Sequence, residues 1–188
     1  MMRRREVVKK LLENRGDLLV IAGLGSTAWD ITAAGDSPLN FPMWGAMGQA
    51  AMFGLGLALA QPKRRVLVIT GDGEMLMGLG SLATIGVQKP QNLSIVVIDN
   101  ERYGETGMQT THTASGVDLS AVARGCGLAI LSGDIGEIRK AVHEGKGPSF
   151  AAVKVQPEKI PLVLPPREGA LLKARFRRAL LGAEADSV

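Results

Sequence analysis

Five short apolar runs divide the chain and predict buried strands. Each run is continuous rather than alternating, as is typical of strands that are covered on both faces. The runs are Leu18–Ala22, Val66–Thr70, Leu93–Ile98, Leu128–Leu131 and Phe150–Val155. Helices are predicted between them, at about 3–15, 25–34, 46–60, 77–87, 118–125 and 135–144. Strands that alternate with helices indicate an α/β fold, a doubly wound and mostly parallel sheet flanked by helices.

The C-terminal end departs from this pattern. Four prolines lie between Pro157 and Pro166, where they exclude regular structure, and a last helix is predicted near 168–181. The 188 residues are enough for one domain of ordinary size. We therefore expect one domain over residues 1–156, followed by a proline-containing arm and helix over residues 157–188.

Composition narrows the classes of function. Hydrophobic residues make up 46% and charged residues 21%, the balance of a folded soluble protein. The formal net charge is +4, and basic residues gather at both ends. They are not interleaved with aromatic groups that could stack on bases, so solvated helix faces or contacts with an acidic partner are favoured over nucleic-acid binding. The two clusters are Arg3, Arg4, Arg5, Lys9 and Lys10, and Lys173, Arg175, Arg177 and Arg178.

The single cysteine and the longest apolar stretch bear on location. Cys126 cannot form an internal disulfide, which fits a reducing compartment such as the cytoplasm, and a small buried hydrophobe is its favoured role. The stretch from Met43 to Ala60 contains Gln49 and several glycines, which favours a buried helix over a membrane span. No apolar region follows the basic start, so we expect no secretory signal.

Polar residues follow two of the predicted strands. Asp72 comes shortly after the strand Val66–Thr70, and Asn100 follows the strand Leu93–Ile98. Ligands of open α/β sheets bind at the carboxyl ends of strands. If the two strands are neighbours, the carboxylate and the amide oxygen face each other and suit Mg²⁺ or Ca²⁺ rather than zinc.

The glycines around Asp72 add a place for phosphate. Gly71 and Gly73 would let backbone N–H groups approach a phosphate, and a helix opening near Met77 would direct its positive end toward it. A Gly-Asp-Gly turn by itself is a weak signal, and a solvated turn is the alternative. The second polar strand end at Asn100 is what strengthens the cation-site interpretation.

The sequence from Gly71 to Asn100 resembles the motif of thiamine diphosphate enzymes, in which GDG is followed, after a spacer of this length, by an asparagine beyond a strand. The resemblance implies that Asp72, Asn100 and the main-chain carbonyl of Arg102 bind Mg²⁺. Members of the family often carry a second asparagine before the ligand, where this chain has Asp99.

A second stretch, Trp44-Gly-Ala-Met-Gly48, resembles the family segment that receives the aminopyrimidine ring. The resemblance implies that the carbonyl of Gly45 accepts a hydrogen bond from the ring, that Ala46 lies beside it, and that Met47 supports the bent cofactor. A core methionine is the alternative for Met47.

The likeness extends along nearly the whole chain. The segments MGQAAMFGLGLALA, GDGEMLMGLGSLATIG, IDNERYGETGMQTTHT and ARGCGLAIL resemble the small, cofactor-binding chain of sulfopyruvate decarboxylases, with phosphonopyruvate decarboxylases slightly more distant. This resemblance implies a lyase that uses thiamine diphosphate and Mg²⁺ to decarboxylate a small anionic 2-keto acid.

The family resemblance also implies a partner. Family members activate the cofactor with a glutamate from a pyrimidine-binding domain, and no glutamate here matches that motif. A separate pyrimidine-binding α subunit is therefore expected, in an α₂β₂ or larger assembly.

Further residues are expected at the cofactor because of their position on a loop or beside the motif. Tyr103, Gly104, Glu105 and Thr106 lie on a glycine-containing loop, of a kind that often closes over an active site. On the same loop, His112 could bind an anionic substrate group or transfer a proton as a catalytic residue, or be merely solvated. Beside the motif aspartate we expect Glu74, acting through its backbone N–H, and Met75, as part of the wall.

Two alternatives remain open. One keeps the cofactor but changes the outcome to carboligation, as in acetolactate synthase or benzaldehyde lyase. The other is a non-catalytic protein that binds a phosphate-containing ligand, which fits less well with Gly45 and Met47.

Overall fold

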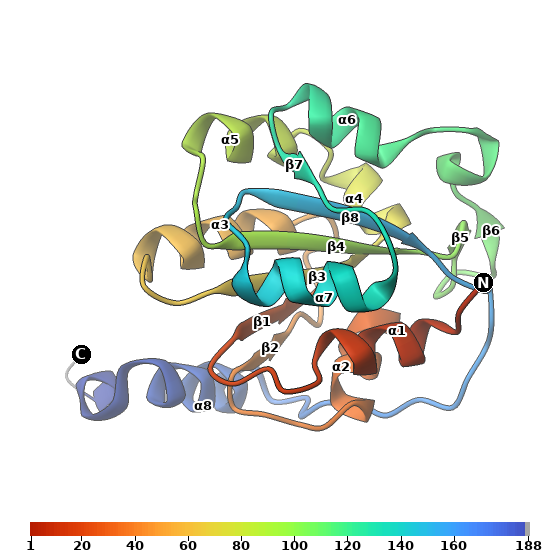
Figure 1. Ribbon diagram of the computed structural model, residues 1–188. Coiled ribbons are helices and arrows are strands. Elements are labelled where there is room, and N and C mark those ends of the chain that lie inside the picture. Colours follow the sequence, from red (N-terminus) through yellow and green to blue (C-terminus); the bar gives the residue numbers. More distant parts are fainter. Residues whose placement is uncertain (187–188) are drawn as a thin grey trace.

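The computed structural model describes residues 1–186 and has a parallel six-stranded sheet at its centre, in the order β2-β1-β3-β4-β8-β7 (Figure 1). The strands of this sheet are β1 (Leu19–Ala22), β2 (Asn40–Pro42), β3 (Val66–Gly71), β4 (Leu93–Asp99), β7 (Ala129–Ile130) and β8 (Ser149–Lys154). The predicted α/β fold with a doubly wound parallel sheet is confirmed.

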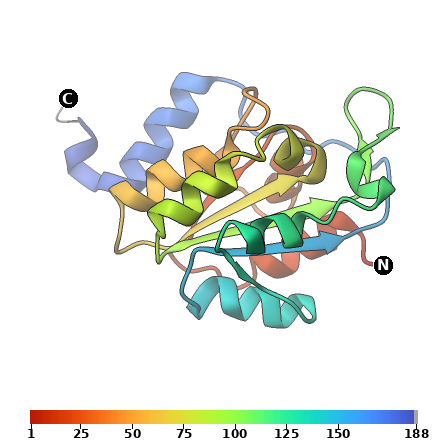
Figure 2. The ribbon, with the colours of Figure 1, turned by 90° about the horizontal axis from the view of Figure 1, so that it is seen from above.

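Helices cover both faces of the sheet (Figures 1 and 2). One face carries α1 (Arg4–Leu11), α2 (Ser26–Ala33) and α7 (Ile135–Glu144). The other carries α3 (Ala50–Ala60), α5 (Ser81–Gln88) and α6 (Leu119–Gly125). Every residue of β4 is buried, because the strand lies in the middle of the sheet between these two layers.

Local signals in the sequence set several helix starts. The Asp118 side chain accepts hydrogen bonds from the N–H groups of Ser120 and Ala121, so the predicted N-cap of α6 is confirmed. A capping box between Asp134 and Glu137 begins α7 at the predicted residue.

Two helix predictions were wrong at their starts. The stretch predicted as one helix near 77–87 is two helices, α4 (Asp72–Met77) and α5, separated by a turn. Helix α4 begins at Asp72 itself, so the helix that follows β3 starts earlier than expected. Helix α3 begins at Ala50 rather than near 46, because Ala46 and Gly48 have positive φ angles of 57° and 88° that a helix does not allow.

Several short strands and one 3₁₀ turn were not predicted from the sequence. Strand β2 pairs with β1 at the sheet edge, and β5 (Arg102–Tyr103) forms a small antiparallel hairpin with β6 (Gln109–Thr110). A 3₁₀ turn, η1 (His112–Ser115), follows the hairpin.

The arm after β8 runs along the carboxyl edge of the sheet and leads to α8 (Gly169–Leu181) and a final 3₁₀ turn, η2 (Gly182–Asp186) (Figure 1). The indole N–H of Trp44 donates to the carbonyl of Pro166 at 2.8 Å. Phe176 of α8 packs edge-on against Phe41 with ring centroids 5.4 Å apart. None of the helices within residues 1–186 is long and apolar enough to cross a membrane.

Candidate functional site

The parallel pairing of β3 with β4 brings the two polar strand ends together. The register runs from Val66↔Leu93 to Gly71↔Ile98, so Asp72 and Asn100 leave neighbouring strands at the same edge of the sheet. Both line one pocket of about 480 Å³. The β1–α2 turn, the start of α4, the loop after β4 and the side chain of Met47 bound this pocket.

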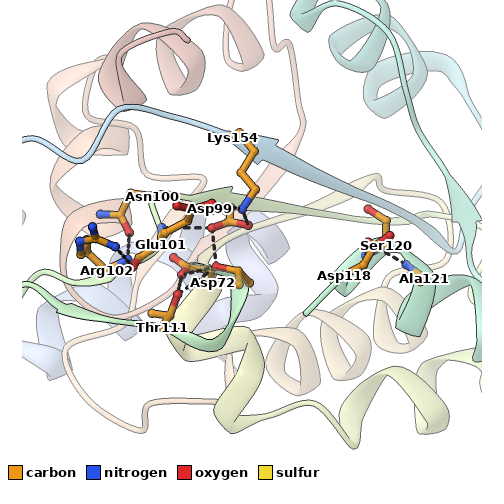
Figure 3. Close-up of polar contacts among 11 residues, drawn as sticks. Asp72, Asp99, Asn100, Glu101, Arg102, Thr111, Asp118, Ser120, Ala121 and Lys154 are labelled. Atoms are coloured by element: carbon orange, nitrogen blue, oxygen red, sulfur yellow. Dashed lines mark hydrogen bonds and ion pairs between the residues drawn. The ribbon is translucent and has the colours of Figure 1, made fainter. Parts of the chain in front are cut away.

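Asp72 is held by hydroxyl groups from beyond the hairpin (Figure 3). It is 1% exposed, and its Oδ2 accepts a hydrogen bond from Thr111 Oγ1 at 2.5 Å and lies 3.2 Å from Thr113 Oγ1. Burial raises the pKa of the Asp72 carboxyl, the Thr111 hydroxyl counteracts this, and the nearby Asp99 adds to it. A cation in the pocket would compensate the cost of burying this charge.

Asn100 and Arg102 present oxygen atoms on one side of the chain. The Asn100 Oδ1 accepts a hydrogen bond from the backbone N–H of Arg102 at 3.0 Å. The hairpin bonds run from Thr111 N to the carbonyl of Glu101 and from Met108 N to the carbonyl of Tyr103. Because successive residues of a strand alternate, the N–H and C=O of Arg102 point away from β6.

Asp99 stands where the family often has asparagine, and its charge is balanced locally. Lys154 Nζ of β8 lies 3.0 Å from Asp99 Oδ2 (Figure 3). Thr113 Oγ1 donates to Asp99 Oδ1 at 2.9 Å. Polar contacts therefore link Asp72 to Lys154 through Thr113 and Asp99. The lysine is the partner that makes the aspartate acceptable at a buried position.

The loop that carries Met47 is held against α4 by two glycines. A Cβ at Gly78 would lie 2.9 Å from the carbonyl carbon of Gly48 and closer still to its oxygen, so the two backbones touch directly. Met47 lines the pocket from this loop. Gly45 and Ala46 are exposed beside it, and neither lines the pocket.

The residues of the motif from Gly71 to Met75 have different environments. The Glu74 side chain turns inward, where its Oε2 accepts from Leu24 N at 3.0 Å and Thr70 Oγ1 at 2.8 Å, so the carboxylate joins the β1–α2 turn to β3. Burial raises the pKa of the Glu74 carboxyl, and the Thr70 hydroxyl counteracts this. Met75 is 2% exposed in the core and does not line the pocket. The ring of Tyr103 occupies the space beside Gly73, whereas Gly71 is open.

The loop expected to cover the cofactor lies at the pocket. Its residues Arg102, Tyr103, Gly104, Glu105 and Thr106 all line it. His112 is exposed and lines the pocket from the first position of η1.

The oxygen atoms at this edge suit a hard cation. Within residues 1–186, no group of three or more His, Cys, Asp or Glu side chains could hold a metal ion. The donors are instead one carboxylate, one amide oxygen and one main-chain carbonyl, a set that leaves positions for phosphate and water, as Mg²⁺ prefers. The residues present therefore fit a magnesium-bound diphosphate.

Sequence reasoning missed the opposite wall of the pocket. Leu24 of the β1–α2 turn lines it, together with Ser26, Thr27 and Asp30 of α2 and Arg4 of α1. The turn carries a signal, because Gly23-Leu-Gly-Ser-Thr follows a buried strand and precedes a helix, much as Gly71-Asp-Gly does. No sequence pattern indicates that Arg4 enters the pocket.

Comparisons with known proteins agree with this geometry. The family model described as thiamine pyrophosphate enzyme, C-terminal TPP binding domain, matches residues 25–153. The β subunit of sulfopyruvate decarboxylase from Methanothermobacter thermautotrophicus is 38% identical over 188 residues, covering 99% of this chain and all of that protein. The corresponding subunit from Methanocaldococcus jannaschii is 43% identical over 131 residues, 69% of each chain.

Two further proteins are similar to the chain over part of their own length. The phosphonopyruvate decarboxylase of Streptomyces viridochromogenes is 38% identical over 78% of this chain, which spans 38% of that protein. A putative thiamin diphosphate-dependent enzyme from Mycobacterium smegmatis has the same fold, with a TM-score of 0.70, 24% identity, and coverage of 84% of this chain and 32% of the other.

Proposed function

Because this chain belongs to the thiamine pyrophosphate enzyme family, as its C-terminal TPP-binding domain, we propose that it is the cofactor-binding subunit of a decarboxylase for sulfopyruvate or phosphonopyruvate. Thiamine pyrophosphate is thiamine diphosphate. The observation that carries the proposal is the single pocket in which Asp72, Asn100 and Met47 meet.

Each part of the pocket has its own task. Asp72, Asn100 and the carbonyl of Arg102 hold Mg²⁺, which fixes the diphosphate. Met47 would support the cofactor from the pocket wall, and the carbonyl of Gly45, exposed beside the pocket, would bind the aminopyrimidine. The bound cofactor supplies an electron sink that allows a 2-keto acid to lose CO₂.

The residues around the pocket entrance act on the substrate. His112 is exposed and lines the pocket, where it can donate a hydrogen bond to an anionic sulfonate or phosphonate group or transfer a proton. The loop over Tyr103–Thr106 excludes water from the reacting atoms.

A separate subunit completes the site in this proposal. The relatives that match this chain over most of their length are β subunits. The Oε2 atom of Glu74 accepts hydrogen bonds from Leu24 N and Thr70, which hold the side chain against the β1–α2 turn. Met77, 68% exposed at the pocket, offers apolar surface for the missing subunit. We propose that this α subunit supplies the activating glutamate, in an α₂β₂ or larger complex.

Titration calorimetry and product analysis test the proposal. The complete complex is expected to bind thiamine diphosphate only with Mg²⁺, and Asp72→Ala to abolish that binding. With sulfopyruvate or phosphonopyruvate, the product is expected to be the aldehyde and CO₂. Acyloin formation would favour a carboligase, and cofactor binding that is indifferent to Asp72→Ala would refute the metal site.

A further inference from the structure

The three consecutive arginines at the start of α1 take different directions. Arg3 Nε lies 2.8 Å from Glu158 Oε2 of the arm, and Arg5 donates to the carbonyl of Pro161 at 2.9 Å. Arg4 lies between them, but it is 3% exposed and lines the pocket. The expectation of a solvated helix face is therefore wrong for Arg4, because a buried guanidinium needs an anion.

Asp30 of α2 balances the charge of Arg4 but accepts no hydrogen bond from its Nη1. Arg4 Nη1 lies 3.3 Å from Asp30 Oδ2, an ion pair without a hydrogen bond. The other carboxylate oxygen accepts a hydrogen bond from Arg5 Nε at 3.1 Å. Within residues 1–186, Arg4 Nε and Nη1 have no hydrogen-bond acceptor. One carboxylate thus serves two guanidinium groups, and the buried one keeps unused donors.

Arg4 shares its pocket with the residues expected to hold a diphosphate. Ser26 and Thr27, on the first turn of α2, line the same wall. Besides Asp30, the acidic groups whose charge acts on Arg4 are Glu158 and Glu105. Burial raises the pKa of Glu105, and the charge of Arg4 counteracts this. Its side chain packs against the position of Gly25, and no ion pair joins it to Arg4 in the described structure.

We propose that Arg4 binds the diphosphate of the cofactor as a second cationic anchor beside the metal ion, an inference that rests on the proposed function. A diphosphate carries more negative charge than one Mg²⁺ neutralises, and a guanidinium donates two parallel hydrogen bonds to phosphate oxygens. Arg4 lies on the N-terminal helix α1, outside residues 25–153, which match the family model.

The test is calorimetry on the complete, cofactor-free complex in Mg²⁺, with thiamine diphosphate and, separately, inorganic pyrophosphate. Arg4→Gln is expected to weaken both about tenfold or more, the loss of a charged hydrogen-bond donor. Arg4→Lys keeps the charge and is expected to lose less. The matched control is Arg5→Gln, which also removes a partner of Asp30 but lies outside the pocket, and it should change affinity by less than about twofold.

The outcomes separate the two proposals. A wild-type complex that binds neither ligand would overturn the proposed function, and this inference with it. If the wild type binds but Arg4→Gln equals Arg5→Gln, Arg4 does not touch the diphosphate. The same conclusion follows if Arg4→Gln weakens thiamine diphosphate but leaves pyrophosphate unchanged. If Arg4→Gln does not fold, Arg4→Lys is the deciding variant. An affinity of Arg4→Lys for the two ligands equal to that of Arg5→Gln, together with an unchanged melting temperature, would refute the bidentate contact.

Discussion

Substituting Gly78 by alanine should displace the loop that carries Met47. The new Cβ would lie 2.9 Å from the carbonyl carbon of Gly48 and 3.1 Å from its Cα, whereas non-bonded carbons prefer about 3.5–4.0 Å. The atoms that the new Cβ would meet belong to the backbone of Gly48 and cannot rotate away. Helix α4 and the loop must therefore separate by about 0.6 Å or more. Overpacking of this kind costs about 1–3 kcal/mol of unfolding free energy.

The functional effect should exceed the effect on stability. Met47 reaches the pocket only through this loop, and a displacement of about 1 Å at an active site can lower the rate about 100-fold. Urea unfolding would measure the stability, and calorimetry and turnover of the complete complex would measure cofactor affinity and rate. Gly80→Ala is the matched control, because a Cβ there meets nothing within 4 Å. If Gly78→Ala matches Gly80→Ala in affinity and rate, the Gly48–Gly78 contact does not position Met47.

Three further substitutions test the packing and the polar chain. Thr111→Val removes the hydroxyl that lies 2.5 Å from Asp72 Oδ2 and should weaken Mg²⁺ binding about tenfold in calorimetry, whereas Thr111→Ser should restore it. Asp99→Asn removes the ion pair to Lys154 and should cost about 1 kcal/mol in urea unfolding, and an unchanged midpoint would show that the pair contributes nothing. Phe150→Ala, at a fully buried position, should cost about 3–5 kcal/mol, and a smaller loss would mean that the core closes around the cavity.

The sequence determined the fold class and predicted a metal site. Continuous apolar runs are typical of strands buried on both faces, so the alternation of strands and helices was sufficient to predict a parallel sheet. The chemistry of Asp72 and Asn100 then pointed to a hard cation, because both residues follow such strands. The spacing of their motif and the resemblance of the flanking segments identified the cofactor.

Only the tertiary structure decided what surrounds these residues. The order of the strands places β3 beside β4, and apolar runs alone contain no information on that order. Thr111, Thr113 and Lys154 reach Asp72 and Asp99 from segments distant in sequence, and ordinary polar residues carry no local signal of such contacts.

Arg4 is the clearest case in which the sequence alone did not predict the position of a side chain. In the sequence it is one of three arginines that look alike, and a solvated helix face explains all three. In the structure the packing of α1 against α2 turns one of them into the pocket and leaves the other two at the arm. Local sequence sets which face of a helix is apolar, but the neighbouring elements determine which charged side chain is buried, because burial depends on contacts between segments far apart in the chain.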